Sequence, residues 1–250
     1  MQLEGFRVTA AHEADHWWFR SRRDLFLRQV DRAARELGFP SHSLRLLDFG
    51  CGTGFNLSFL REYGEIFGAD RLQPEDREFR RQAGFQLLDV ERDLAAHEGS
   101  FHLVTALDVI EHLDDDVQGL RELRSLLVPG GQIVLTVPAY DWLWSGEDVI
   151  SEHRRRYTRY GVIRACESAG LHVQFASYFN LSILPAMAAV VWARRVLARR
   201  GEPRSNLWMP GSWLNQALYA LTSREASWVG AERVSLPAGT SVLCRVRKDR

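Results

Sequence analysis

The sequence predicts an α/β protein built around a doubly wound, mostly parallel β-sheet. Short apolar segments suited to buried strands recur along the chain, and segments with helical spacing of apolar residues lie between them. The first apolar segment, at residues 44–49, runs directly into three glycines spaced two apart. Strands that alternate with helices form a parallel sheet covered on both faces, because each crossover must pack back onto the sheet.

The first half of the chain supplies one long helix and five strands. The helix is expected at residues 11–37, with a stop at residues 38–40. The strands are expected at residues 44–49, 65–70, 84–90, 101–108 and 132–138. The clearest intervening helix ends at the Pro129-Gly130-Gly131 segment, and its apolar residues are Val117, Leu120, Leu123 and Leu127.

The second half contains two further strands separated by a long insertion. Thr158 is placed to cap a helix that ends before Gly170, and strands are expected at residues 171–178 and 240–247. The segment between these strands is too long for a hairpin and is expected to fold as helices, because it contains Trp192, Trp208, Trp213 and Trp228.

One part of this insertion has two interpretations. Residues 181–197 are nearly all apolar, and arginines are frequent from residue 194 to residue 204. Such a helix can cap an apolar pocket and keep its arginines in water, or it can lie in a membrane interface. We favour the cap, since the insertion returns to a core strand, and leave peripheral membrane contact as the alternative.

The charge balance and the cysteines exclude several classes of protein. Lys plus Arg and Asp plus Glu are equal at 32 each, and a chain without net charge is a poor polyanion binder, so no nucleic-acid partner is expected. Cys51, Cys166 and Cys244 stand far apart, which fits a reducing compartment and excludes a cysteine-built zinc site. No metal ligand is assigned. No apolar signal core begins the sequence, and the apolar run at residues 183–193 is shorter than a bilayer span, so a cytoplasmic protein is expected.

The glycine-rich turn is the most informative stretch. Gly50, Gly52 and Gly54 allow a sharp turn and a close approach of a ligand to the backbone. Asp70, at the end of the next strand, can accept both hydrogen bonds of a ribose diol. The spacing GxGxG differs from the GxGxxG that cradles a dinucleotide pyrophosphate, and Phe55 follows it, so a pyrophosphate ligand fits less well.

Four motifs occur in an order that resembles class I S-adenosylmethionine-dependent methyltransferases. They are LLDFGCGTG, GAD, FHLVTALDVIEHL and LVPGGQIVLTVP, and the resemblance covers about residues 12–178 and the final strand. It implies a seven-stranded, Rossmann-like sheet whose last strand is antiparallel, and S-adenosyl-L-methionine as cofactor. It also implies a helical lid at 1–40, a cofactor-binding core at 41–178, a helical insertion capping the substrate at 179–238 and a final core strand at 239–250.

The resemblance carries cofactor-binding roles to individual positions. Asp108 would end its strand beside the sulfonium, and Asp70 would hold the ribose. The methionine part would be held by Asp48, Gly50, Gly52 and Gly54, and the adenine flanked by Asp89 and Val90. The block around Val90 departs from the small residues usual in the family. Neighbouring members of the same predicted cofactor site are Cys51, Arg71 and Val109.

The N-terminal HWWFRSRR block is similar to a subgroup of these enzymes. Its helix would lie over the cofactor, with Arg22 paired to the cofactor carboxylate and Trp18 as a packing lid. The alternative is an amphipathic helix that tryptophans anchor on the domain.

Methyl transfer to a hydroxyl or an ammonium group requires a base, most often a histidine. We predict His153 as that base, with Asp148 orienting it. His112, just past a strand end, is the second candidate; the alternative for it is to orient the loop or the cofactor.

A second block, LWS–D–HRRRY, resembles the same subgroup and supplies the predicted acceptor site. Rings at Tyr140 and Trp144 can wall a pocket, and Arg155 and Arg156 can hold an anionic group beside Tyr157. The alternative is a rigid loop whose arginines lie in water.

The predicted function is methyl transfer to oxygen or nitrogen of a small-molecule, peptide or lipid-like acceptor. A nucleotide-dependent oxidoreductase could use the same fold, but the GxGxG spacing argues against it. A non-catalytic module that binds S-adenosylmethionine or a membrane surface is the third hypothesis, and the intact glycines and Asp70 argue against it. Neither the identity of the acceptor nor the oligomeric state is predicted.

Overall fold

A computed structural model of the protein describes residues 9–39, 42–71, 85–197 and 209–249. Seven strands form one sheet in the order β3-β2-β1-β4-β5-β7-β6. The first five strands pair in parallel, and β7 is antiparallel to both of its neighbours, which confirms the predicted α/β sheet. The strands are β1 (Leu44–Phe49), β2 (Gly64–Asp70), β3 (Gln86–Asp89), β4 (Phe101–Leu107), β5 (Leu127–Pro138), β6 (His172–Phe179) and β7 (Ser241–Arg247).

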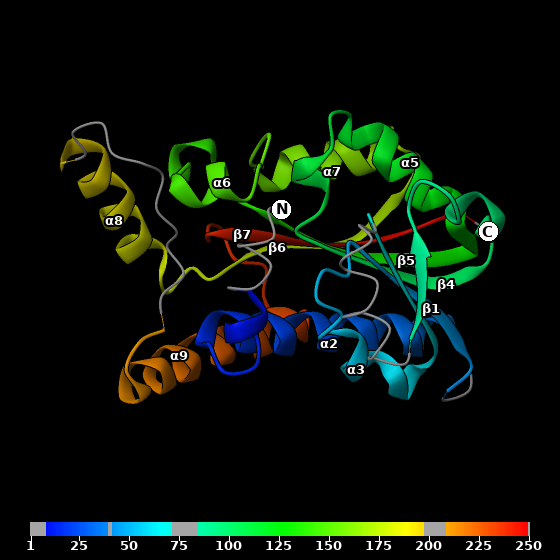
Figure 1. Ribbon diagram of the computed structural model, residues 1–250, viewed down its shortest axis with the longest axis horizontal. Coiled ribbons are helices and arrows are strands. Elements are labelled where there is room, and N and C mark those ends of the chain that lie inside the picture. The colour runs from blue at the N-terminus through cyan, green and yellow to red at the C-terminus, as the bar shows by residue number, and fades with distance from the viewer. Residues whose placement is uncertain (1–8, 40–41, 72–84, 198–208, 250) are drawn as a thin grey trace.

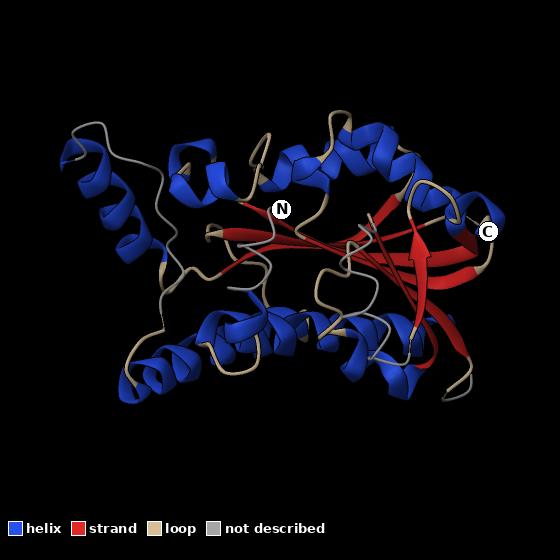
Figure 2. Cartoon of the chain, in the orientation of Figure 1, coloured by secondary structure: helices blue, strands red, loops and turns tan. Residues whose placement is uncertain are grey.

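Helices cover both faces of this sheet (Figures 1 and 2). One layer contains α2 (Trp17–Leu37), α3 (Leu57–Leu60) and α9 (Ser212–Gly230), with α2 and α9 side by side. The opposite layer contains α5 (Asp116–Leu126), α6 (Gly146–Ile150) and α7 (Arg159–Ser168). Single turns of 3-10 helix occur at η1 (Arg61–Tyr63), η2 (Leu94–His97), η3 (Ile110–His112) and η4 (Asp141–Leu143).

The sheet separates two apolar cores, and adjacent residues of β1 show how. Leu46 packs with Leu25 and Val30 of α2 in one core, whereas Leu47 packs with Leu120 of α5 in the other. Side chains alternate between the faces of a strand, so a strand buried on both faces carries a continuous apolar run. This is why residues 44–49 could be identified as a central strand.

Two predicted boundaries are wrong. The helix expected over residues 11–37 is interrupted, because a turn at residues 13–15 precedes His16, whose ring accepts a hydrogen bond from Trp18 N and caps α2. The Asn215 amide of α9 bonds both to Trp17 N and to the Asp15 carbonyl, which holds the interruption in place. The strand expected at residues 132–138 begins at Leu127 instead, and its irregular pairing with β4 accommodates the Pro-Gly-Gly segment.

The insertion contains two helices in the described part of the chain. The first, α8 (Leu184–Leu197), buries Val191 and exposes Trp192 and Val196. It lies at one end of the molecule (Figure 1), while α9 packs along α2. Trp208 and the arginines at 199, 200 and 204 fall outside the described residues. The cap, the membrane alternative and the proposed division into domains therefore stay predictions. Within the described ranges, no helix combines the length and the apolar character needed to cross a bilayer.

Candidate functional site

The glycine turn begins at the C-terminal end of β1. Gly50, Gly52 and Gly54 have φ angles of +74°, +52° and +78°, a region that side chains with a Cβ rarely adopt. A Cβ at Gly50 would also lie 2.5 Å from Val109 Cγ2. The Gly50 backbone N–H donates to the Ala69 carbonyl of β2 at 2.7 Å, so the turn is tied to the neighbouring strand.

Asp70, the last residue of β2, lies against this turn. Its Oδ2 accepts a hydrogen bond from the Gly52 backbone N–H at 2.8 Å. A Cβ built on Gly52 would meet no atom within 4 Å, so the space in front of that glycine is open. The exposed Arg71 follows and pairs with Glu91 at 3.7 Å. The predicted ribose ligand and the glycine turn are thus brought together.

The predicted adenine-flanking residues lie at the same edge of the sheet. Asp89 is the register partner of Asp70 across β2 and β3, and Val90 N donates to the Asp70 carbonyl at 3.2 Å. The Asp89 carboxylate accepts from Glu91 N at 3.0 Å. The carboxylates of Asp70 and Asp89 therefore end neighbouring strands, as in a cofactor cleft at the carboxyl edge of a parallel sheet.

Asp48 supports the turn from inside the sheet. Its carboxylate is buried and accepts a hydrogen bond from Thr105 Oγ1 on β4 at 2.6 Å. Burial, together with the charge of Asp70 and against the opposing effect of the Thr105 hydrogen bond, raises the pKa of Asp48 to about 7. Cys51 is also buried, and a Cβ added to Gly68 would lie 2.9 Å from its Sγ. Its small side chain fits a tight contact between the turn and β2.

Arg22 of α2 reaches the ends of three strands. Its guanidinium donates to the carboxylate of Asp108, to Thr136 Oγ1 at 3.0 Å and to Ser241 Oγ at 3.1 Å. Thr136 in turn donates to Asp108 Oδ1 at 3.1 Å. The sequence predicted Arg22 and Asp108 as separate contacts of one cofactor, and the structure shows them as an ion pair. Thr136 and Ser241 were missed, since the pairing of β5 with β4 brings Thr136 to this point and the pairing of β5 with β7 brings Ser241.

Two aromatic rings flank the Arg22 guanidinium. Its carbon lies 5.0 Å from the centroid of Trp18 and 5.1 Å from that of Phe179. Arg22 is largely buried, while Asp108 is partly exposed and has a positive φ of +57°. A strained backbone next to an accessible carboxylate is a feature typical of functional sites.

Asp148 and His153 form the predicted pair. His153 Nδ1 lies 2.9 Å from Asp148 Oδ1. The fully buried Asp148 also binds Arg156 through two contacts of 2.7 and 2.8 Å, and it accepts from Ser145 N at 2.7 Å. Burial alone would raise the pKa of Asp148, but the hydrogen bonds from His153 and Arg156 outweigh it and hold that pKa well below its usual value. Asp148 therefore stays a carboxylate, and His153 Nε2 remains for other contacts.

His112 and Glu111 stand beside this pair. The rings of His112 and His153 meet edge to face with centroids 4.9 Å apart. Burial and the neighbouring His153 lower the pKa of His112. The Glu111 carboxylate is fully buried, and burial together with Asp108 raises its pKa well above the usual value. Glu111 was not predicted as a site residue, although in sequence it lies between Val109 and His112, which were.

Aromatic side chains of the predicted acceptor site gather near the end of β5. Tyr140 stacks on Tyr178 at 5.1 Å and on Trp142 at 5.5 Å between ring centroids. Trp144 is half-buried, and its backbone carbonyl accepts from Arg195 of α8 at 2.9 Å. The contact places α8 next to this loop.

The charged residues of the LWS–D–HRRRY block are bound within the protein. Arg155 donates to the carbonyls of Leu113 and Asp114 and pairs with Asp116 at 3.4 Å. Tyr157 OH donates to Asp116 Oδ2 at 2.7 Å. These contacts fasten the loop to the segment after η3 and to the start of α5, and the Arg156–Asp148 pair fastens it to α6. Their role toward an acceptor stays a prediction.

The fold and the site define a class of protein. A seven-stranded sheet with an antiparallel β7, a glycine turn after β1 and a carboxylate ending β2 is the arrangement of S-adenosylmethionine-binding methyltransferases. A family model described as a methyltransferase domain matches residues 12–181, and the chain belongs to that family. Membership of this family assigns S-adenosyl-L-methionine as the cofactor of the chain.

Curated relatives share part of their length with this chain. The ubiquinone biosynthesis O-methyltransferase of Xanthomonas campestris pv. campestris (strain B100) is 33% identical over 117 residues, which are 43% of this chain and 48% of that protein. The protein of the same name from Ruegeria pomeroyi is 35% identical over 127 residues, 46% of this chain and 51% of that protein. The chain thus spans about half the length of the curated relatives it matches.

Solved structures share the fold at low sequence identity. An S-adenosylmethionine-dependent methyltransferase from Mesorhizobium loti superposes with a TM-score of 0.52 and 16% identity, covering 87% of this chain and 96% of that one. The 1,6-didemethyltoxoflavin-N1-methyltransferase of Burkholderia thailandensis, with bound 1,6-didemethyltoxoflavin and S-adenosylhomocysteine, superposes with a TM-score of 0.52 and 14% identity, covering 93% of this chain and 81% of that one.

Proposed function

We propose that this chain transfers a methyl group from S-adenosyl-L-methionine to a hydroxyl oxygen of a small, partly aromatic acceptor. Membership of the methyltransferase family carries the reaction class. The curated relatives are named O-methyltransferases, which favours oxygen over nitrogen. The stacked rings of Tyr140, Trp142 and Tyr178 beside the site favour an acceptor with an aromatic or apolar portion.

The single observation that carries the proposal is the open turn at Gly52 with the Asp70 carboxylate against it. These residues fit the cofactor, because a Cβ would fill the space at Gly52 and Asp70 can accept hydrogen bonds from a ribose diol. When bound, S-adenosylmethionine supplies an electrophilic methyl group. Asp70 and the turn would bind and orient that ligand, while Trp18 and α2 would shield it from water.

On the acceptor side, the protein must hold a hydroxyl in line and receive its proton. The cluster of Glu111, His112 and His153 is suited to this, since Asp148 fixes the His153 ring and leaves Nε2 available. The aromatic rings would orient the acceptor at that point. A peptide or a lipid-like acceptor, and contact of α8 with a membrane surface, are the alternatives to this small acceptor.

The cofactor proposal is tested by calorimetry with S-adenosylhomocysteine. The wild-type chain should bind it, and Asp70→Asn should weaken binding about tenfold or more, the usual effect of losing hydrogen bonds to a charged group. The control is Asp114→Asn, since the Asp114 side chain is exposed and pairs with Arg154 instead of the glycine turn. Equal affinity in Asp70→Asn and wild type, or no binding to folded wild type, would contradict the proposal.

The reaction is tested by transfer of a radiolabelled methyl group to paired acceptors. Phenols and catechols should be labelled, and the matching anilines and alkylamines should be labelled much less. Preferential labelling of the amines would remove the assignment to oxygen while leaving the cofactor intact.

A further inference from the structure

Three potential metal ligands meet at the end of β4. Glu111 and His112 belong to η3, and His153 belongs to the turn after α6, some forty residues later in the chain. One donor atom from each of the three residues lies within 4.8 Å of the others. Around a tetrahedral ion with metal–ligand bonds of about 2.0–2.3 Å the donors lie roughly 3.3–3.8 Å apart, so the three groups would close by up to about 1.5 Å to share one ion.

Glu111 is the observation that points to a bound ion. Its side chain is fully buried, and no other residue in the described part of the protein makes a hydrogen bond to either carboxylate oxygen. A buried carboxylate normally has a hydrogen-bond or ion-pair partner, because burial without one costs several kcal/mol. The nearby cations do not meet this need, since Arg22 binds Asp108 and Arg156 binds Asp148.

The two imidazoles are held as metal-binding histidines usually are. Such rings donate their second N–H to a carboxylate or a backbone carbonyl, which fixes the ring and directs the other nitrogen at the ion. His153 makes this contact through Nδ1 with Asp148, which Arg156 and Ser145 hold in turn. His112 has a hydrogen bond with the backbone of Glu152.

We propose that Glu111, His112 and His153 bind one divalent transition-metal ion, with Zn²⁺ the ion that fits best. Two imidazoles and one carboxylate are a donor set that favours Zn²⁺ over Mg²⁺, which prefers oxygen ligands. Three protein ligands leave a position of the ion for water or for an acceptor oxygen. Binding of an acceptor oxygen to the ion rests on the proposed O-methylation, whereas the ion site itself does not.

The proposal changes what the sequence predicted for two residues. No metal site was assigned, because only a cysteine-built zinc site was considered and Glu111 was not singled out. His153 was predicted to be a general base. As a ligand, His153 would not receive the acceptor proton; the ion would lower the pKa of the acceptor hydroxyl, its proton would pass to solvent water, and Asp148 would be a positioning residue.

The test is calorimetric titration of Zn²⁺ into chain that carries no histidine tag and has been treated with a chelator. Wild type should bind one Zn²⁺ per chain with micromolar or tighter affinity, and Mg²⁺ more weakly. Glu111→Gln, which keeps the volume and removes the charge, should weaken Zn²⁺ binding at least tenfold. His172→Ala should bind like wild type, because His172 is exposed and pairs with Asp249. Circular dichroism establishes that each variant is folded.

The outcomes separate the two proposals. Equal Zn²⁺ affinity in Glu111→Gln and wild type, no Zn²⁺ binding, or tighter binding of Mg²⁺ would overturn the metal site. Asp148→Asn should weaken Zn²⁺ binding about 10–100-fold, the usual effect of losing an outer-shell carboxylate. Binding of S-adenosylhomocysteine to the metal-free chain, measured in parallel, reports only on the proposed function.

Discussion

Asp48 shows how a single strand residue beside the glycine turn can also govern stability. Its carboxylate lies under the glycine turn, where the Thr105 hydroxyl is its hydrogen-bond donor and the sheet excludes water. Burial raises its pKa from an ordinary 3.8 to about 7 in the folded chain. The folded protein therefore retains the Asp48 proton at pH values where the unfolded chain has lost it.

This difference predicts a pH-dependent stability. Below about pH 4 the Asp48 carboxyl is protonated in both the folded and the unfolded state. Between pH 4 and about 7 it ionises in the unfolded state only, so the free energy of unfolding falls as the pH rises through this range. The free energy of unfolding of wild type relative to Asp48→Asn should fall by roughly 2–4 kcal/mol between pH 4 and pH 8. Urea denaturation at several pH values measures it.

The control for this experiment is Asp114→Asn, which removes an exposed carboxylate. Its difference from wild type should stay nearly constant over the same pH range. A constant difference for Asp48→Asn as well would mean that Asp48 ionises normally in the folded state.

At the level of elements, the turn from β1 into α3 depends on backbone conformations that only glycine adopts easily. Gly50 combines a φ of +74° with the close approach of Val109 from the loop after β4. The positive φ of Gly50 and its contact with Val109 together fix the turn against the neighbouring strand end. A side chain at Gly50 would push the two loops apart.

Gly50→Ala should therefore cost about 1–3 kcal/mol of stability and weaken binding of S-adenosylhomocysteine more than tenfold. Gly211→Ala is the matched control, since Gly211 has a negative φ and a Cβ there would meet no atom within 4 Å. Thermal unfolding and calorimetry measure the two effects. If Gly50→Ala binds the ligand like Gly211→Ala, the turn does not need this glycine.

The elements that the sequence predicted correctly are those with local signals. The strand at residues 44–49, the glycine turn and the Asp70 position follow from apolar runs and spacing that one segment contains. The start of α2 was wrong because a distant side chain, Asn215, holds the preceding turn. The start of β5 was wrong because strand pairing overrides the turn propensity of a Pro-Gly-Gly segment.

In the candidate site, too, contacts between residues close in sequence were predicted and contacts between distant residues were missed. His153 and Asp148 were paired correctly, since only four residues lie between them at the end of one short helix. Glu111, Thr136 and Ser241 were missed, because each acquires its environment from strands and loops far away in the chain. Burial without a partner, the property that singles out Glu111, has no counterpart in a linear sequence.

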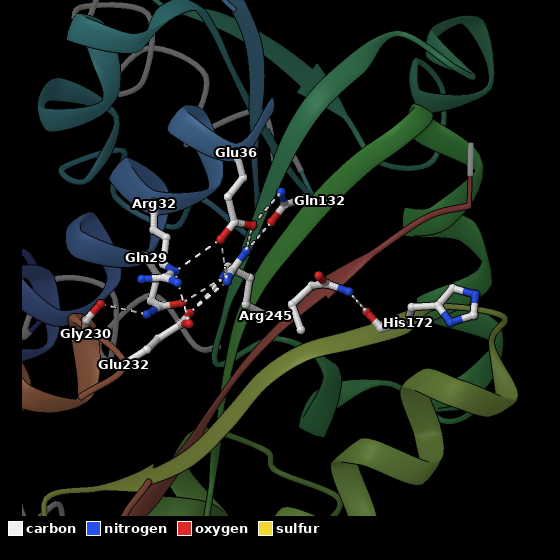
Figure 3. Close-up of polar contacts among 9 residues, drawn as sticks. Gln29, Arg32, Glu36, Gln132, His172, Gly230, Glu232 and Arg245 are labelled. Carbon is white, nitrogen blue, oxygen red and sulfur yellow. Dashed lines mark hydrogen bonds and ion pairs between the residues drawn. The ribbon is translucent and has the colours of Figure 1, made fainter. Parts of the chain in front are cut away.

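At the scale of the whole molecule, one buried arginine joins the helix layer to the sheet (Figure 3). Arg245 of β7 donates to Gln132 of β5 at 2.7 Å and to Glu232, after α9, at 2.8 Å. It also binds Glu36 near the end of α2 at 3.1 Å. Gln29 of α2 completes the link through the Gly230 carbonyl at 2.8 Å. The network holds α2, and hence Arg22, over the strand ends.

Replacing Arg245 by methionine keeps much of the side-chain volume and removes all of these bonds. Glu36 and Glu232 would lose their main partner, and breaking a buried ion pair from one side typically costs about 3–5 kcal/mol. Arg245→Met should therefore lower the free energy of unfolding by that amount, whereas Arg247→Ala on the same strand should change it by less than about 1 kcal/mol. Because uncompensated charge is the cause, adding Glu232→Gln to Arg245→Met should restore part of the loss. Urea denaturation of wild type, the two single variants and the double variant measures these differences. An Arg245→Met variant as stable as wild type would mean that the network positions α2 without stabilising the fold.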